Sequence, residues 1–206
     1  MIELWPEFIR CMHATLSLRQ CAAKLKISLS TAFRWRHAIL SASRLSDATT
    51  LRDHVEIHEL RMAHSQKGCR RLDRPPRVRG ARTHDPLLLR TRRVCVVAAH
   101  DQRRRTYSEH VDVRNLLSRH LCAVLLSRLR KPATIVSAYG PFSSYAVLAS
   151  AAGARFRWAF PRTDQLDGVA AFLKRIRSFL LPFRGVATKY LDNYLRWHRV
   201  VEASLA

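Results

Sequence analysis

The stretch LSLRQCAAKLKISLSTAFRWRHAILSAS, residues 16–43, decides how the first part of this chain folds. Its first half repeats apolar side chains at helical spacing, at Leu18, Ala22 and Leu25. Ser17 can cap that helix, and Ser28 or Ser30 can cap a second helix after a short turn. The apolar side that we expect to pack on the first helix comprises Leu29, Ala32, Phe33, Ile39 and Leu40. The pattern predicts two helices joined by a tight turn.

The second of these helices carries a polar and basic face. The side chains expected to point outward are Ser30, Thr31, Arg34 and His37. A helix-turn-helix has this layout, and it offers the first residues of its second helix to base edges in the major groove of DNA. The alternative is a small helical module whose basic face is only solvated. The charge of the whole chain favours DNA binding over that alternative.

The composition is that of a folded, strongly basic protein. The chain has 206 residues with 37 Lys plus Arg against 15 Asp plus Glu, a formal net charge of +22. Such an excess is typical of nucleic-acid binding. Most of the cations are Arg, whose planar fork matches phosphate oxygens and guanine edges. A hydrophobic fraction of 48% argues against a disordered basic tail.

The sequence supports neither a membrane protein nor a protein stabilised by zinc or disulfides. There is no apolar run of about 18 residues and no signal peptide or lipidation motif, so we expect no membrane partner and a cytoplasmic location. The five cysteines are scattered, and none forms a C-x-x-C pair. They give neither a zinc ribbon nor a disulfide framework, and we expect them to be small core residues.

We divide the chain into three parts. Residues 1–43 form the helical module, which includes a short leading helix within residues 1–12, and residues 44–53 form a polar linker. Residues 54–206 form a larger unit that contains a basic insertion at 65–93, which is rich in Pro and lacks a sustained period. That insertion is a candidate arm for contacting DNA phosphates; the alternative is a disordered loop.

The larger unit has an α/β pattern. Strands are predicted at 54–63, 93–99, 106–111, 133–138 and 155–160. Helices are predicted at 112–130, where Pro132 stops the helix, at 145–152, along the stripe from Val169 to Leu180, and from about Thr188 onward. The order indicates a mixed sheet flanked by helices.

Three stretches carry a family resemblance. They are SLRQCAAKLKISLSTAFRWRHAIL at 17–40, KGCRRLDRPPRVRG at 67–80 and FRGVATKYLDNYLRWHR at 183–199. Together they resemble bacterial insertion-sequence transposases, which have an N-terminal helix-turn-helix and an RNase H-like DDE core. Residues 81–92 and 160–168 do not resemble that family.

The resemblance implies three acidic ligands that hold two divalent metal ions, Mg²⁺ in the intact family, for strand cleavage and transfer. Here His58 stands at the first Asp position, between Glu56 and Glu59, and Ala138 or Tyr139 stands at the second. The third position aligns with Leu173, and no Asp or Glu occurs from Val113 to Thr163. We therefore expect no metal cofactor and no intact catalytic site in this copy.

The resemblance and the charge together predict a protein that binds the double-stranded DNA of its element's ends. The expected DNA-binding residues are Ser30, Thr31, Arg34, Arg36 and His37 in the module, and Lys67, Arg70 and Arg71 in the insertion. A homodimer is a further expectation. The alternatives are a non-catalytic DNA-binding relic or regulator and a basic RNA-binding protein; the latter agrees with the charge but not with the terminal motifs.

Overall fold

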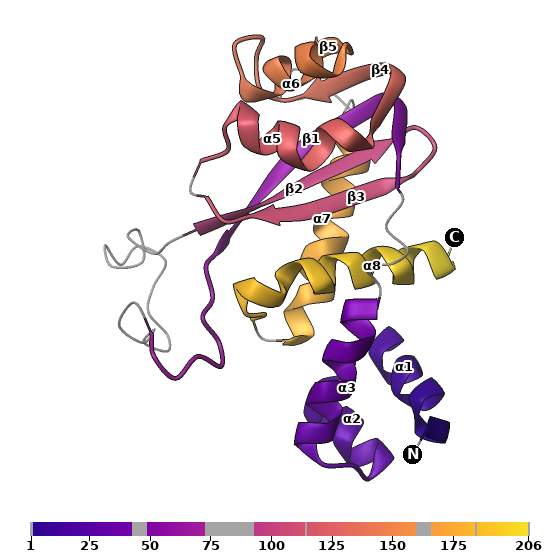
Figure 1. Ribbon diagram of the computed structural model, residues 1–206. Coiled ribbons are helices and arrows are strands. Elements are labelled where there is room, and N and C mark those ends of the chain that lie inside the picture. The colour runs from indigo at the N-terminus through magenta and orange to yellow at the C-terminus, as the bar shows by residue number, and fades with distance from the viewer. Residues whose placement is uncertain are drawn as a thin grey trace.

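The computed structural model is a mixed α/β structure with a three-helix bundle at one end (Figure 1). It describes residues 2–42, 49–72, 93–113, 115–159, 166–183 and 185–205. Residues 44–48 of the predicted linker and residues 73–92 of the basic insertion lie outside the described residues. The predicted helical and strand segments can therefore be compared with the structure over most of the chain.

The N-terminal bundle follows from local capping. It comprises the 3-10 turn η1 (Ile2–Leu4) and the helices α1 (Trp5–His13), α2 (Leu18–Leu25) and α3 (Leu29–Ala42). Ser17 and Gln20 form a reciprocal capping box at the start of α2, and Lys26 ends this helix in the left-handed conformation with φ of 52°. Ser28 caps α3, because its Oγ accepts the backbone N–H of Thr31 at 3.0 Å. The two predicted helices and the tight turn between them are confirmed.

Five strands form one sheet. They are β1 (Leu51–Ala63), β2 (Arg93–Asp101), β3 (Thr106–Val111), β4 (Leu129–Ser137) and β5 (Arg155–Trp158). The order across the sheet is β3-β2-β1-β4-β5; β2 is antiparallel to both β1 and β3, whereas β4 is parallel to both β1 and β5. The predicted hairpin and the mixed sheet are confirmed. β1 starts three residues before the predicted strand, inside the segment expected to be linker.

Helices cover both faces of this sheet (Figure 1). Val55 and Ile57 of β1 belong to a core beneath α5 (Ser118–Leu125) and α6 (Ser144–Ala152). Leu60 belongs to a second core with α7 (Asp167–Leu180) and α8 (Leu191–Leu205). Successive side chains of a strand point to opposite faces of the sheet, so Val55 and Ile57 enter the first core and Leu60 enters the second. α6 ends at Gly153, in the left-handed conformation with φ of 60°, as predicted.

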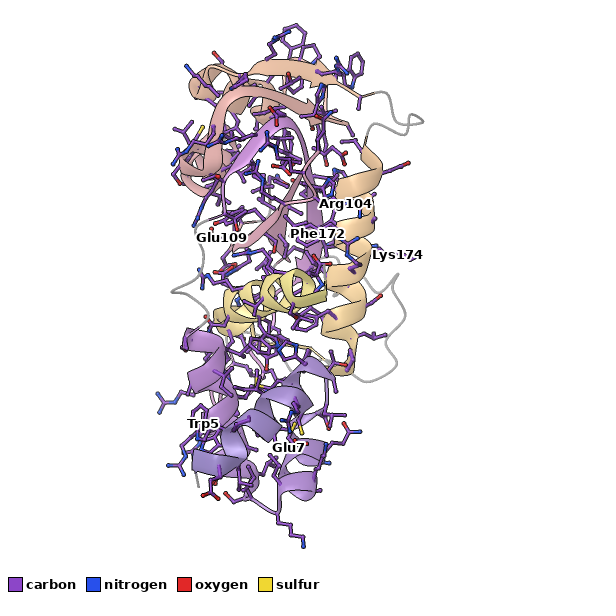
Figure 2. All side chains as sticks on the ribbon, turned by 90° about the vertical axis from the view of Figure 1, so that its right-hand side faces the viewer. Trp5, Glu7, Arg104, Glu109, Phe172 and Lys174 are labelled. Carbon is purple, nitrogen blue, oxygen red and sulfur yellow. The ribbon has the colours of Figure 1, made fainter. Side chains whose placement is uncertain are left out.

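The helices α7 and α8 join the bundle to the sheet. The predicted stripe on α7 is buried, and Figure 2 shows Phe172 directed toward the sheet and Lys174 away from it. α8 crosses between the sheet and the N-terminal bundle (Figure 1) and contacts both α3 and β3. The second core is continuous from α1 and α3 through α8 to β2. Within the described residues, the bundle thus shares its core with the larger unit.

One predicted helix is too long. Residues 112–130 were expected to be helical, but α5 spans only Ser118–Leu125, a 3-10 turn follows at Leu126–Arg128, and β4 already begins at Leu129. Leu129 continues the helical spacing of the apolar residues and is nevertheless the first inward residue of a strand. Pro132 lies in β4 where the register with β1 shifts, a position at which a missing N–H does not break the ladder.

The cysteine prediction holds only in part. All five are free thiols, of which Cys11, Cys21 and Cys95 are buried, as expected of core residues. Cys122 is partly exposed and Cys69 is exposed, so the expectation of a core position is wrong for Cys69. Cys69 follows β1 in a turn, outside both cores.

Candidate functional site

The first turns of α3 present a mixed face to solvent. Ser30 and Arg34 are exposed, as the sequence predicts, and Thr31 is half-buried. The Ser28 Oγ lies 2.8 Å from the hydroxyl oxygens of both Ser30 and Thr31. This hydroxyl network fixes the start of α3, and it leaves the Arg34 side chain on the outer surface.

Arg36 does not belong to that outer face. Its side chain is buried, and its guanidinium donates hydrogen bonds to the carbonyl oxygen of Leu16 at 2.6 Å and to the sulfur of Cys21 at 3.5 Å. The same guanidinium lies 5.4 Å from the ring centroid of Phe183 and close enough to Tyr194 of α8 to act on its phenol electrostatically. Arg36 therefore connects α2, α3 and α8, and a role in holding these helices replaces the expected contact with DNA.

Three more positions of α3 differ from the sequence prediction. Leu29 and Phe33, expected to pack inward, are 48% and 43% exposed. His37, expected to point outward, is half-buried between two rings, with centroid distances of 4.3 Å to Phe33 and 4.2 Å to Tyr190. Burial, followed by the nearby cations, lowers the pKa of His37 and favours the neutral ring. These positions differ from the prediction because α8 packs on the end of α3, near His37, and leaves the start of α3, with Leu29 and Phe33, open to solvent.

The described part of the basic insertion is anchored to the chain before α8. Lys67 Nζ donates to the carbonyl oxygens of Phe183 and Gly185, each at 3.0 Å. Ser65 and Thr188 exchange two hydrogen bonds of 2.8 Å. Lys67 is thus engaged within the protein, whereas Arg70 and Arg71 are exposed, as DNA contacts must be.

The expected metal site lies where β1, β4 and α7 meet. Glu56 pairs with Val136 of β4 and with His100 of β2 in the register of the sheet. Its Oε2 accepts the backbone N–H of Val169 at 2.7 Å, and its Oε1 lies 4.0 Å from His100 Nδ1. The carboxylate therefore sits at the first turn of α7, where the helix dipole favours a negative charge.

None of the positions expected to supply the metal ligands carries a carboxylate. His58 is two residues further along β1; its ring centroid is 6.0 Å from that of Tyr139, and burial lowers its pKa. Leu173, at the third expected position, is buried, and Arg177 one turn later places a positive charge near His58. Across the part of the chain that the structure describes, no group of three or more His, Cys, Asp or Glu side chains could hold a metal ion.

Glu59 is on the other side of the sheet from Glu56. Its Oε2 lies 3.3 Å from the hydroxyl of Tyr145 on α6, and its Oε1 accepts bonds from Tyr139 at 3.3 Å and Arg61 Nε at 2.9 Å. The side chain is only 5% exposed. Burial and the Glu59 charge raise the pKa of Tyr145, so its hydroxyl stays a donor. Glu56 and Glu59 cannot share one ion.

Sequence reasoning missed a histidine–carboxylate pair behind the sheet. His110 lies in β3, where its Nδ1 is 2.8 Å from Asp192 Oδ2. The backbone N–H of His110 donates to Asp192 Oδ1 at 2.8 Å. His110 and Asp192 are 82 positions apart in the chain, so no local sequence pattern indicates that they pair. The hydrogen bond to Asp192 raises the pKa of His110, so the pair ties β3 to α8.

Of the comparisons with known proteins, only the one with solved structures finds a match. No protein-family model and no curated protein matches the chain. Among solved structures, a pre-cleavage Mos1 transpososome is similar with a TM-score of 0.40 and 12% identity over 92% of this chain and 71% of that chain. A TM-score this low does not establish a common fold. In the described residues, no helix is long and apolar enough to span a membrane.

Proposed function

We propose that this protein is derived from an insertion-sequence transposase, binds duplex DNA through α2 and α3, and has lost the metal site that strand cleavage requires. The observation that carries the binding proposal is the start of α3. There Ser30 and Arg34 are exposed on the second helix of a capped helix pair. No Asp or Glu occurs between Glu7 and Asp47, so α2 and α3 themselves carry no carboxylate to repel phosphate, and Glu7 of α1 is paired with Lys24 of α2 at 2.8 Å.

The proposed ancestry rests on the motifs at 17–40, 67–80 and 183–199, together with the sheet. The order β3-β2-β1-β4-β5, with an antiparallel half and a parallel half, is consistent with an RNase H-like core. The motifs at 67–80 and 183–199 also meet in space, because Lys67 bonds the carbonyl oxygens of Phe183 and Gly185. Segments that resemble the family in sequence are therefore neighbours in the fold.

The loss of catalysis follows from the ligands present. Two-metal phosphoryl transfer needs several oxygen ligands around ions about 3.5–4 Å apart. None of the expected ligand positions carries Asp or Glu, and the Oε2 of the nearby Glu56 accepts the Val169 N–H. His58 offers nitrogen, which weakens magnesium binding, and Leu173 offers no ligand atom at all. The residues present do not fit a pair of Mg²⁺ ions.

Duplex binding across a salt series tests the proposal. We expect filter retention of duplex DNA at low salt and a steep loss of affinity as salt rises, because bound Arg and Lys side chains displace counterions. Arg34→Ala should weaken binding more than Arg119→Ala, which removes an equal charge from the distant helix α5. No binding at low salt, or equally tight binding of duplex RNA, would contradict the proposal.

Restoring the carboxylates tests the ancestry of the core. His58→Asp combined with Ala138→Asp places acidic groups at the first and second expected positions. Gain of Mg²⁺- or Mn²⁺-dependent strand cleavage by this double variant would support descent from a cleaving enzyme. His58→Asn with Ala138→Asn, which has similar volume and no added charge, is the matched control and should stay inactive.

A further inference from the structure

We infer that α3 reads thymine methyl groups in the major groove with Phe33 and Leu29, beside a polar contact from Arg34. This inference rests on the proposed function, since it concerns which bases the DNA-binding face would select. Thymine is the base that exposes a methyl group in the major groove, and apolar side chains, Phe among them, recognise that methyl.

The first observation is an apolar pair on the open side of α3. Leu29 is 48% exposed and Phe33 is 43% exposed, and the two are four residues apart, so they lie on one face of the helix. Both stand in the first turns, the part of a second helix that enters the groove. Burying the exposed part of these side chains would stabilise the bundle, yet more than two fifths of each remains open to solvent.

The second observation is that the Phe33 ring is held in place. The His37 ring packs against it at a tilt of 57°, with a centroid distance of 4.3 Å, and the His37 ring in turn lies 4.2 Å from that of Tyr190. Lys189 Nζ lies 4.9 Å from the Tyr190 ring. A supported ring loses little conformational freedom on binding, which is the property of an aromatic anchor in an interface.

The third observation is the charge around the pair. Ser30 and Arg34 follow Leu29 and Phe33 by one residue each, and Lys26 in the preceding turn is exposed as well. No Asp or Glu occurs anywhere from residue 8 to residue 46. Apolar side chains set among cations without carboxylates match a polyanion that displays methyl groups. A second copy of this basic chain would bring like charges together, which disfavours self-association through this face.

The arrangement also predicts the kind of sequence that is bound. Arg pairs best with the acceptors of guanine, and Phe33 is its neighbour along the helix. The selected DNA should therefore carry thymine close to guanine, within the three or four base pairs that one helix reaches.

Base analogues test the inference. Duplexes that bind the full chain are first selected from a random pool, and each thymine is then replaced by uracil, which keeps the hydrogen-bonding groups and lacks the methyl. We expect about a 3- to 10-fold loss of affinity at one or two positions. Phe33→Ala should abolish the difference between thymine and uracil at those positions. Arg34→Ala should weaken both duplexes and keep the difference, and Val147→Ala, which removes an exposed apolar side chain from α6, should change neither.

The outcomes are separable. If no duplex is selected, the proposed function itself fails. If duplexes are selected but no thymine position responds to uracil, or if Phe33→Ala keeps the response, DNA binding stands and the inference is overturned. It is also overturned if Phe33→Ala leaves DNA affinity unchanged and converts a dimer into a monomer in sedimentation. Because Phe33 is exposed, we expect its Ala variant to keep the wild-type melting temperature within a few degrees.

Discussion

The carboxylate of Glu56 on β1 accepts a hydrogen bond from the backbone N–H of Val169 on α7, with 2.7 Å between Oε2 and N. In an enzyme of the family that the motifs resemble, a carboxylate near this place would face metal ions. Here it satisfies one of the N–H groups that the first turn of every helix leaves open. Glu56 thus has a structural role that does not depend on metal.

This relationship predicts the effect of removing the carboxylate. Glu56→Ala should lower the free energy of unfolding by about 1 kcal/mol, the usual cost of losing a side chain that caps a helix. Glu56→Gln keeps an acceptor oxygen, so it should lower the free energy of unfolding by less than Glu56→Ala. Its remaining cost is the lost interaction of the charge with the helix dipole. Denaturant unfolding measures both. Glu3→Gln, at an exposed position in η1, is the control and should have no measurable effect.

The close approach of α7 to β1 and β2 makes Gly168 a second test. A Cβ added there would lie 2.3 Å from His100 Nδ1 and 3.0 Å from Glu56 Oε2. Gly168→Ala should therefore destabilise the protein by about 1–3 kcal/mol, although Ala is favoured over Gly in a helix. Gly140→Ala would meet only the Trp158 ring at 3.8 Å and serves as the control. A stability of Gly168→Ala equal to or above wild type in thermal unfolding would contradict this packing.

The two arginines of α3 should behave differently. Arg36→Ala removes charged hydrogen bonds to Leu16 and Cys21 inside the bundle, and we expect the free energy of unfolding to fall by about 2–3 kcal/mol. Arg34→Ala should change stability by less than about 0.5 kcal/mol and should weaken DNA binding instead. Parallel unfolding and binding measurements on both variants separate these roles. Equal stability of the two variants would mean that Arg36 does not hold the helices together.

Stability should depend on pH through His110 and Asp192. The pKa of His110 is raised above its unfolded value, chiefly by its hydrogen bond to Asp192, so its contribution is full below about pH 6.5 and is lost as pH rises through the folded pKa. Burial raises the pKa of Asp192, but its bonds to His110 outweigh this and lower it overall. The Asp192 contribution is lost as pH falls below about 4.

The stabilising pair is therefore strongest between about pH 4 and pH 6.5. His110→Gln should lose more stability, relative to wild type, at pH 5.5 than at pH 8.5. The difference between the two proteins is the quantity to measure, because burial lowers the pKa values of His58 and His198 and makes them act in the opposite direction. Asp192→Asn should show the same trend, and the double variant should lose less than the sum of the two. A gap independent of pH would contradict the pairing.

The sequence predicted the elements that carry a strong period. The stripe on α7 and the alternation along β1 each reflect one dominant burial pattern, and both are confirmed. The helix expected at 112–130 fails because Leu129 extends a helical period into a strand. The spacing of apolar residues indicates which side of an element is buried, but it does not indicate where the backbone changes from helix to strand.

The errors on α3 have a tertiary cause. Arg36 is buried and Phe33 is exposed because α8 packs on the end of α3, more than 150 residues away in the chain. No pattern within α3 contains that information. The absence of Asp and Glu from Val113 to Thr163 was visible in the sequence, whereas the helix cap by Glu56 and the separation of Glu59 onto the other face required the fold.

We propose that this protein binds DNA without cutting it. The most direct test incubates the wild-type chain with a selected duplex and Mg²⁺ or Mn²⁺ and measures retention and strand cleavage in the same samples. We predict retained, uncut DNA, and the same result for Glu56→Gln. Metal-dependent cleavage by the wild type that Glu56→Gln abolishes would contradict the account.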